Sequence, residues 1–331
     1  MPFRSGFVCI LGRPNAGKST LLNALVGEKL AIISPKPQTT RNRIQGIVNV
    51  PKGKGKGKDQ GGAQIVLIDT PGVHKPDSSL GRKMMVEVRE ALEGCDLALL
   101  IMDATRKLDQ RDEFALQILK HSPAKVFLVL NKVDLLRGGK SKLLPLIEEY
   151  QKLHQFHEII PISALKRDGL DILLEQVTVA LPAGPPFFPP EHVTDQPARF
   201  MAAEIIRERV LMETEEELPY ATTVIVDSFE EGAKLTRIAA TIYCEREGQK
   251  GILIGKKGQM LKRIGTSARL QIERMIGTKV FLELYVKVQA NWRESRGFVE
   301  ELDWRRQLEH LTGGRNELPK AARSEEGRRR T

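Results

Sequence analysis

The first half of the chain alternates short, continuous apolar runs with segments whose apolar residues recur at helical spacing. Apolar runs of this length, bounded by turn residues, are typical of strands buried on both faces of a sheet. Strands that alternate with helices predict a mostly parallel sheet with helices on both faces, which is an α/β domain. The predicted strands are 7–11, 47–50, 65–68, 97–102, 126–130 and 159–162, and the predicted helices include 83–93 and 112–120.

The second half of the chain predicts a smaller α+β domain with the element order α-β-β-α-α-β. Its longest helical stretch carries apolar residues at four-residue intervals, and Gly265 is expected to interrupt it. The predicted elements are a helix at 199–212, strands at 222–228 and 235–244, two helical segments on either side of residues 255–258, and a last strand at 280–288.

A proline-rich segment separates these two halves. Five of the ten residues from 181 to 190 are proline, and proline stiffens a chain and breaks regular structure. We therefore predict four regions: a first domain at 1–181, a linker at 182–190, a second domain at 191–312 and a disordered basic tail at 313–331. Residues 52–58 alternate lysine with glycine, which predicts a flexible hairpin tip; a solvated loop and an RNA contact both stay open for it.

The composition adds a charge argument. The chain of 331 residues has 52 Lys and Arg against 42 Asp and Glu, a net charge of +10. An excess of this sign favours a polyanionic partner such as nucleic acid or an anionic membrane surface, although it can also serve solubility. The three cysteines are scattered without a Cys-x-x-Cys pair, and we see neither a signal peptide nor an apolar run of membrane-spanning length. We therefore expect a soluble cytoplasmic protein with reduced cysteines.

The first candidate site is a glycine-rich loop at residues 12–19, which reads Gly-Arg-Pro-Asn-Ala-Gly-Lys-Ser. It follows a predicted strand and opens an amphipathic segment, the context that a P-loop requires. Its glycines allow backbone N–H groups to point at phosphate oxygens, and the start of the helix adds further donors. Lys18 would contact the β- and γ-phosphates, and the Ser19 hydroxyl would bind Mg²⁺.

The strand at 65–68 runs directly into Asp-Thr-Pro-Gly at 69–72. A carboxylate at this place can hold Mg²⁺ through water, and the backbone N–H of Gly72 can contact the γ-phosphate. The polar, proline-containing loop at 33–41 lies where a P-loop NTPase has a segment that the γ-phosphate and Mg²⁺ order. A solvent loop without a role has a similar composition.

The strand at 126–130 is followed by Asn131, Lys132 and Asp134, which select a base. The Asp134 carboxylate can accept hydrogen bonds from guanine N1–H and the 2-amino group, a pair that adenine does not offer. Ser163 and Ala164 follow the last predicted strand, where a backbone N–H can contact guanine O6. The predicted nucleotide-binding residues are Gly12, Arg13, Pro14, Asn15, Ala16, Gly17, Lys18, Ser19, Thr20, Asp69, Thr70, Pro71, Gly72, Asn131, Lys132, Asp134, Ser163 and Ala164.

The second candidate site is the Gly-x-x-Gly turn of the second domain. Glycines without side chains let a sugar-phosphate backbone approach the main chain, and two lysines add positive charge. Residues 251–296 contain ten Lys and Arg against three Asp and Glu, whereas residues 199–235 contain four against nine. This one-sided charge suits a polyanion groove better than general solubility does. The predicted RNA-binding residues are Ile254, Gly255, Lys256, Lys257 and Gly258.

Residues 8–180 resemble the Era-like branch of the translation-factor-class GTPases, in the 12–19 loop and in Gln-Thr-Thr-Arg at 38–41. The resemblance implies that Ser19, Thr40 and Asp69 hold Mg²⁺ and that Asn15 serves as a K⁺ ligand. Ras-like enzymes place a catalytic glutamine after the glycine of Asp-x-x-Gly. Val73 stands there in this chain, so we assign no catalytic residue and expect slow intrinsic hydrolysis, or hydrolysis helped by another group.

The second domain resembles a type II KH domain, and the GTPase–linker–KH order over residues 6–300 is similar to the Era family of bacterial ribosome-assembly GTPases. The resemblance implies a cytoplasmic monomer that binds GTP and GDP. It also implies binding of 16S rRNA near its 3′ end, a role in assembly of the 30S ribosomal subunit, and peripheral contact with the inner membrane as a further expectation. The insert at 52–58 departs from the family pattern.

Two rival functions stay open at this stage. A GTPase that acts in tRNA modification shares the style of the P-loop, but the KH pattern and the absence of a C-terminal cysteine speak against it. A GTPase of the membrane surface would bring its basic face to anionic lipid.

Overall fold

The computed structural model describes residues 2–34, 36, 39–52, 62–120, 122–136 and 140–307. The predictions for Gln38, for most of the lysine–glycine run and for the basic tail fall outside these residues. No helix of the described part is long and apolar enough to cross a membrane.

The larger lobe is built on a six-stranded sheet in the order β2-β3-β1-β4-β5-β6. β2 is antiparallel to β3, and the other neighbouring strands are parallel, which places the carboxyl ends of five strands along one edge. The prediction of a mostly parallel sheet is therefore confirmed. The strands are β1 Arg4–Leu11, β2 Ile44–Val50, β3 Ala63–Asp69, β4 Leu97–Asp103, β5 Lys125–Asn131 and β6 Glu158–Pro161.

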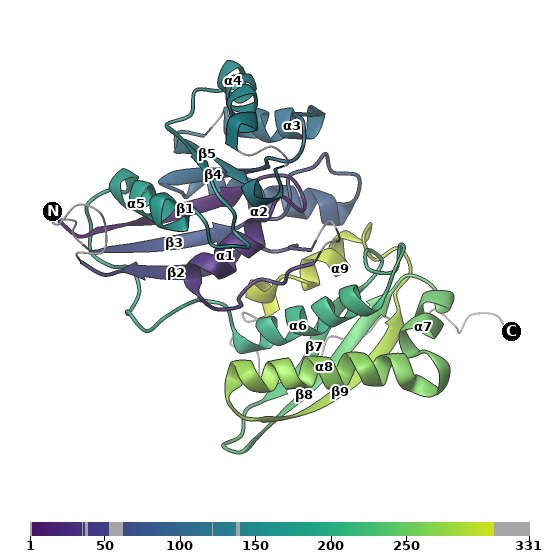
Figure 1. Ribbon diagram of the computed structural model, residues 1–331. Coiled ribbons are helices and arrows are strands. Elements are labelled where there is room, and N and C mark those ends of the chain that lie inside the picture. The colour runs from purple at the N-terminus through teal and green to yellow at the C-terminus, as the bar shows by residue number, and fades with distance from the viewer. Residues whose placement is uncertain are drawn as a thin grey trace, which may run out of the picture.

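Helices cover both faces of this sheet (Figure 1). Leucines of α1 and α5 pack against one face, whereas α2, α3 and α4 pack against the other. The strands between them are buried on both sides, which explains why they appear as continuous apolar runs in the sequence. The helices are α1 Lys18–Val26, α2 Ser79–Glu93, α3 Gln110–Leu119, α4 Leu143–Leu153 and α5 Leu170–Ala180. Two 3₁₀-helices lie at Val133–Leu135 and Lys140–Lys142.

The smaller lobe has a three-stranded sheet in the order β7-β8-β9, and α6 and α8 lie on one of its faces (Figure 1). β7 is antiparallel and β9 parallel to β8. The predicted order α-β-β-α-α-β is confirmed. The elements are α6 Ala198–Glu213, β7 Thr223–Glu230, β8 Leu235–Cys244, α7 Glu247–Ile254, a 3₁₀-helix at Lys256–Gly258, α8 Gln259–Ile276, β9 Lys279–Val288 and a short helix α9 Arg296–Glu301.

The prediction that Gly265 interrupts the long helix is wrong. Helix α8 continues through it for 18 residues, with Ile264, Ala268 and Ile272 buried on one face. A Cβ at position 265 would stand 3.2 Å from Cδ1 of Leu284 on β9. Glycine costs a helix only about 1 kcal/mol, and here it allows the helix to lie close against the sheet.

The proline-rich segment is attached to the larger lobe. The side chain of Gln64, fully buried on β3, accepts hydrogen bonds from the backbone N–H groups of Phe187 (2.7 Å) and Phe188 (2.9 Å). The Phe187 ring also lies 4.8 Å from the ring of Phe7. The smaller lobe contacts the larger one through Trp292. The side chain of Trp292 is fully buried against Leu80 of α2, and its indole N–H donates to the carbonyl oxygen of Ala221.

Candidate functional site

The P-loop occupies the turn between β1 and α1, and two glycines make this turn possible. Gly12 has φ +145°, and a Cβ there would stand 2.3 Å from the carbonyl oxygen of Ile101. Gly17 has φ +100°, and a Cβ would stand 2.2 Å from Nδ2 of Asn131. Side chains at these positions would therefore meet neighbouring strands, so the loop can curl only with glycine.

Lys18 is buried inside the loop. Its ammonium group donates to the carbonyl oxygens of Gly12 and Arg13, each at 3.0 Å. Burial lowers the pKa of Lys18 to about 8, while the nearby carboxylate of Asp69 acts in the opposite direction. A buried ammonium held by loop carbonyls is placed to meet a phosphate oxygen at the centre of the loop.

Three oxygen-bearing side chains from separate elements meet beside Lys18. The Ser19 hydroxyl on α1 donates to Asp69 Oδ2 at 2.6 Å and lies 2.9 Å from the Thr40 hydroxyl, which is itself 3.4 Å from Asp69 Oδ2. The other carboxylate oxygen of Asp69 is buried and has no hydrogen-bond partner among the described residues. Burial raises the pKa of Asp69 to about 6, against the effects of Lys18 and the two hydroxyls.

This oxygen cluster fits a divalent metal. Two hydroxyls and a carboxylate are ligands that Mg²⁺ accepts. A cation would also satisfy the buried Asp69 oxygen and remove the cost of its negative charge. The three residues predicted to hold the metal are therefore the three that come together.

At the other end of the cavity, Asn131 connects two loops. Its Nδ2 donates to the carbonyl oxygen of Ala16 at 2.9 Å, and its Oδ1 accepts from the backbone N–H of Ala164 at 2.9 Å. Lys132 extends back to the P-loop, where its ammonium donates to the carbonyl oxygen of Asn15 at 2.8 Å. Asp134 lies in the following 3₁₀-helix with an exposed side chain.

These loops enclose a cavity of about 500 Å³, a volume in the range of small-molecule sites. Sequence reasoning missed several side chains of its wall. Leu135 and Leu165 are largely exposed hydrophobic residues at its base-binding end. The signal in the sequence that could have identified these two residues is a leucine directly after each base-contacting motif. A planar base needs an apolar side chain to cover its face. The other missed wall residues are Ile32, Ile33, Ser34, Thr39 and Arg106.

Some predicted residues point elsewhere. The Arg13 guanidinium is buried against α3, where it pairs with Asp109 (3.0 Å) and Asp112 (3.2 Å). The Thr70 hydroxyl donates to the carbonyl oxygen of Ile10 at 2.8 Å. Neither residue is among those that line the cavity between the loops. Val73 is buried in the core and presents no polar group to the cavity.

The Gly-x-x-Gly turn lies between α7 and α8 of the smaller lobe and is open to solvent. Gly255 has φ +70°, and a Cβ there would stand 2.7 Å from Cβ of Met260. Gly258 has φ +77°, and a Cβ there would meet nothing within 4 Å. Lys256 and Lys257 between them have exposed side chains. The turn thus exposes its main chain at two glycines, with two lysine ammonium groups between them in solvent. This arrangement suits the approach of a sugar-phosphate backbone.

The segment that carries Thr40 is bound on its far side by the smaller lobe. Arg207 of α6 donates to the carbonyl oxygen of Thr39, and Arg41 donates to that of Thr222 at 2.8 Å. Lys36 donates to carbonyl oxygens at the end of α6. One short segment therefore contacts Ser19 and Asp69 through Thr40 and the second lobe through the neighbours of Thr40.

Comparison with known proteins gives consistent matches. A family model described as 50S ribosome-binding GTPase matches residues 7–132, and a KH domain model matches residues 217–293. The GTPase Era of Geobacter metallireducens is 52% identical over 305 residues, which are 92% of this chain and 98% of that protein. The GTPase Era of Ruminiclostridium cellulolyticum is 47% identical over 306 residues, 92% of this chain and 99% of that protein.

Two solved structures match nearly the whole described chain. A variant of Aquifex aeolicus Era bound to GDP·AlF₄⁻ is 41% identical with a TM-score of 0.83. The crystal structure of Era in complex with MgGDPNP and nucleotides 1506–1542 of 16S ribosomal RNA is 41% identical with a TM-score of 0.84. Each match covers 91% of this chain and 99% of the other.

Proposed function

The chain belongs to the Era family of GTPases, and from this premise we propose that it is a GTP-driven switch that binds 16S rRNA near its 3′ end during assembly of the 30S subunit. The observation that carries the proposal is the 39–41 segment, which contacts the metal-binding oxygens and the RNA-binding lobe at once. The relative whose crystal structure contains MgGDPNP and nucleotides 1506–1542 of 16S rRNA supports the choice of both ligands.

In this proposal the P-loop binds the phosphates of GTP. Ser19, Thr40 and Asp69 hold Mg²⁺, which supplies positive charge to the β- and γ-phosphates when it is bound. Lys18 exchanges its two carbonyl partners for phosphate oxygens, and that contact restores the charged form that burial disfavours. Asp134 accepts from the guanine edge, and Leu165 covers the ring.

The position at which Ras-like enzymes carry a water-orienting glutamine holds Val73 in this chain, which is apolar and buried. We propose that Asn15 instead contributes to a K⁺ site beside the phosphates. A monovalent cation held there would stabilise the charge that develops on the transferred phosphoryl group. Slow intrinsic hydrolysis then makes the GTP state long-lived, which suits a switch that waits for a partner.

The RNA-binding step uses the smaller lobe. The bare backbone of the Gly-x-x-Gly turn clamps single-stranded RNA, and Lys256 and Lys257 pair with its phosphates. When Thr40 binds the metal, its neighbours Thr39 and Arg41 are held in place as well. The smaller lobe is hydrogen-bonded to these two neighbours and is therefore also held in place. Loss of the γ-phosphate releases Thr40 and loosens this connection.

The test measures the affinity of a labelled 3′-terminal 16S rRNA fragment in the presence of Mg²⁺ with a non-hydrolysable GTP analogue or with GDP. We expect tighter binding with the analogue, and Thr40→Ala should remove the difference. Thr105→Ala is the control, because Thr105 is not among the residues of the cavity wall and its exposed hydroxyl bonds to the Asp103 carboxylate. Equal affinities in both nucleotide states, or equal binding of an unrelated fragment of the same length, would contradict the proposal.

A further inference from the structure

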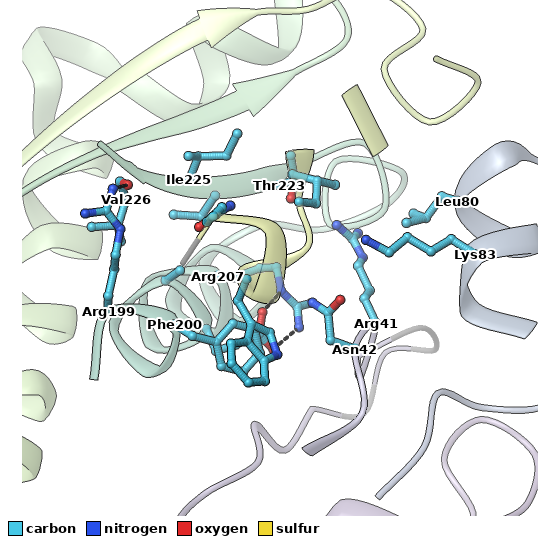
Figure 2. Close-up of a pocket in the computed structure, with 16 residues that line it drawn as sticks. Arg41, Asn42, Leu80, Lys83, Arg199, Phe200, Arg207, Thr223, Ile225 and Val226 are labelled. Carbon is cyan, nitrogen blue, oxygen red and sulfur yellow. Dashed lines mark hydrogen bonds and ion pairs between the residues drawn. The ribbon is translucent and has the colours of Figure 1, made fainter. Parts of the chain in front are cut away.

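A cavity of about 30 Å³ lies between the two lobes, and most of the charged side chains on its wall are positive (Figure 2). Arg41 and Lys83 reach it from the larger lobe, and Arg199 and Arg207 reach it from α6. Among the described residues of the wall, Glu204 is the one carboxylate. The wall therefore has four cations and one anion.

Several donors on this wall have no acceptor in the part of the chain that the structure describes. They are Nε of Arg41, Nε of Arg199, Nη1 of Arg207 and Nε1 of Trp304. Guanidinium and indole N–H groups donate hydrogen bonds and never accept them. Arg41 is 5% exposed and Arg207 is 2% exposed, so bulk water does not reach these donors. Buried polar groups in native proteins are almost always satisfied, and an acceptor in this cavity would satisfy them.

Among the described residues, no carboxylate pairs directly with Arg41, and Glu204 acts on its charge only through space. The partners of Arg41 are neutral: the carbonyl oxygens of Thr222 and Tyr220, and the ring of Trp292 at 5.3 Å. Both carboxylate oxygens of Glu204 are occupied by the guanidinium of Arg207. Burial lowers the pKa of Arg41 to about 9, and the charge of Arg207 adds to this effect more than any other neighbouring cation does. Two buried guanidinium groups, those of Arg41 and Arg207, thus line one cavity with a single carboxylate, that of Glu204.

We propose that this cavity binds a small inorganic anion, held between Arg41 and Arg207, with Arg199 and Trp304 as further donors. Such an anion accepts hydrogen bonds from every side and donates none or few, which is what a wall of donors requires. The cavity exceeds the roughly 10–15 Å³ that one water needs, and it is too small for a nucleotide or for an organic acid of the size of glutamate. Chloride and inorganic phosphate share this chemistry.

The site has a consequence for the connection between the lobes. Arg41 follows the metal-binding Thr40, and Arg207 also donates to the carbonyl oxygen of Thr39. An anion between the two guanidinium groups therefore fastens this segment to α6. The anion site does not depend on the proposed role in 30S assembly, since its predicted effect is on the stability of the free protein.

The test compares thermal unfolding of the full chain in potassium chloride, potassium phosphate and potassium glutamate at equal pH and ionic strength. Glutamate is too large for the cavity, so we expect a melting temperature about 2–4 °C higher in at least one inorganic salt. Arg41→Met should remove this difference. Arg89→Met is the matched control, because it removes an exposed arginine of α2 that is not among the residues of the cavity wall. The anion of this cavity is identified by the inorganic salt whose stabilising effect Arg41→Met removes, because phosphate also binds at the P-loop.

Crystals grown or soaked in bromide provide direct evidence. We expect an anomalous peak between Arg41 and Arg207. If Arg41→Met does not fold, the half-buried Arg199→Met should still reduce the difference in melting temperature between salts. A cavity that contains only water in bromide crystals, together with equal melting temperatures of the wild type in the three salts, would overturn the proposal.

Discussion

Replacing Gly258 by aspartate tests whether the Gly-x-x-Gly turn binds RNA, because the chain contains a closely matched control. Gly258 precedes α8 and Gly277 follows it, with φ of +77° and +75°. A Cβ at either position would meet nothing within 4 Å. Gly258→Asp and Gly277→Asp therefore add the same charge and the same backbone strain in open space. With 1.5 Å per residue, the 18-residue helix separates them by about 27 Å, well beyond a Debye length of about 8–10 Å.

We expect Gly277→Asp to lower the stability of the protein more than Gly258→Asp does. We expect Gly258→Asp to lower the affinity for RNA more than Gly277→Asp does. A side chain in the left-handed region costs about 1–2 kcal/mol at both positions. Aspartate at the N-terminal cap recovers up to about 1 kcal/mol, whereas at the C-terminal end it opposes the helix dipole by about 0.3–1 kcal/mol. Gly277→Asp should therefore melt at the lower temperature. Gly258→Asp should lose RNA affinity, because its carboxylate occupies the place where a phosphate must approach.

The size of this loss follows from electrostatics. Two like charges about 4 Å apart repel by about 1 kcal/mol in water and by about 4 kcal/mol near a protein surface. These energies correspond to a loss of about 5-fold to about 1000-fold in affinity for a 3′-terminal 16S rRNA fragment, measured by fluorescence anisotropy. Gly258→Asn has the same shape without the charge and should bind more tightly than Gly258→Asp. Equal losses for Gly258→Asp and Gly277→Asp, or no loss for either, would refute the assignment of the turn.

The remaining predictions concern the nucleotide site. Asp134→Asn should weaken GTP and favour xanthosine triphosphate, whose 2-oxo group suits an amide donor; equal affinity for both nucleotides in a competition assay would contradict the role of Asp134. Hydrolysis should be faster in K⁺ than in Na⁺, and Asn15→Ala should reduce the difference; equal wild-type phosphate release in the two salts would exclude the K⁺ site. Burial raises the pKa of Asp69 from 3.8 to about 6, so folding takes up a proton between these values. The free energy of unfolding without nucleotide should then fall by at most about 3 kcal/mol as the pH rises from about 4 to about 6. Asp69→Asn should remove this slope in urea titrations, and an unchanged slope would show that another group causes it.

The strands, the P-loop turn and the place of the Asn131–Asp134 motif at the end of a strand were predictable because their signals are local. Gly12, Lys18 and Asp69 each stand at a fixed offset from an apolar strand, and the parallel sheet then brings the strand ends together. The prediction for Gly265 failed because helix propensity is weak beside tertiary packing. The sequence shows the glycine at position 265. It does not show that Leu284, 19 positions away on β9, packs closely against that glycine.

The contacts between the lobes could not be predicted from local patterns. Arg207 and Thr39 are 168 residues apart, and each looks like an ordinary polar surface residue in its own segment. The buried pair of Arg13 with Asp112 is similar, since a P-loop arginine is equally compatible with a phosphate contact. In both cases, the partner comes from a different element, and its identity depends on how the elements pack.

Crosslinking in cells followed by sequencing of the attached RNA tests the central claim most directly. A GTP-driven switch that binds the 3′ end of 16S rRNA predicts reads concentrated in that region. The enrichment should disappear in Gly258→Asp and persist in Gly277→Asp. Reads concentrated on tRNA, or crosslinks to RNA that both variants retain equally, would contradict it.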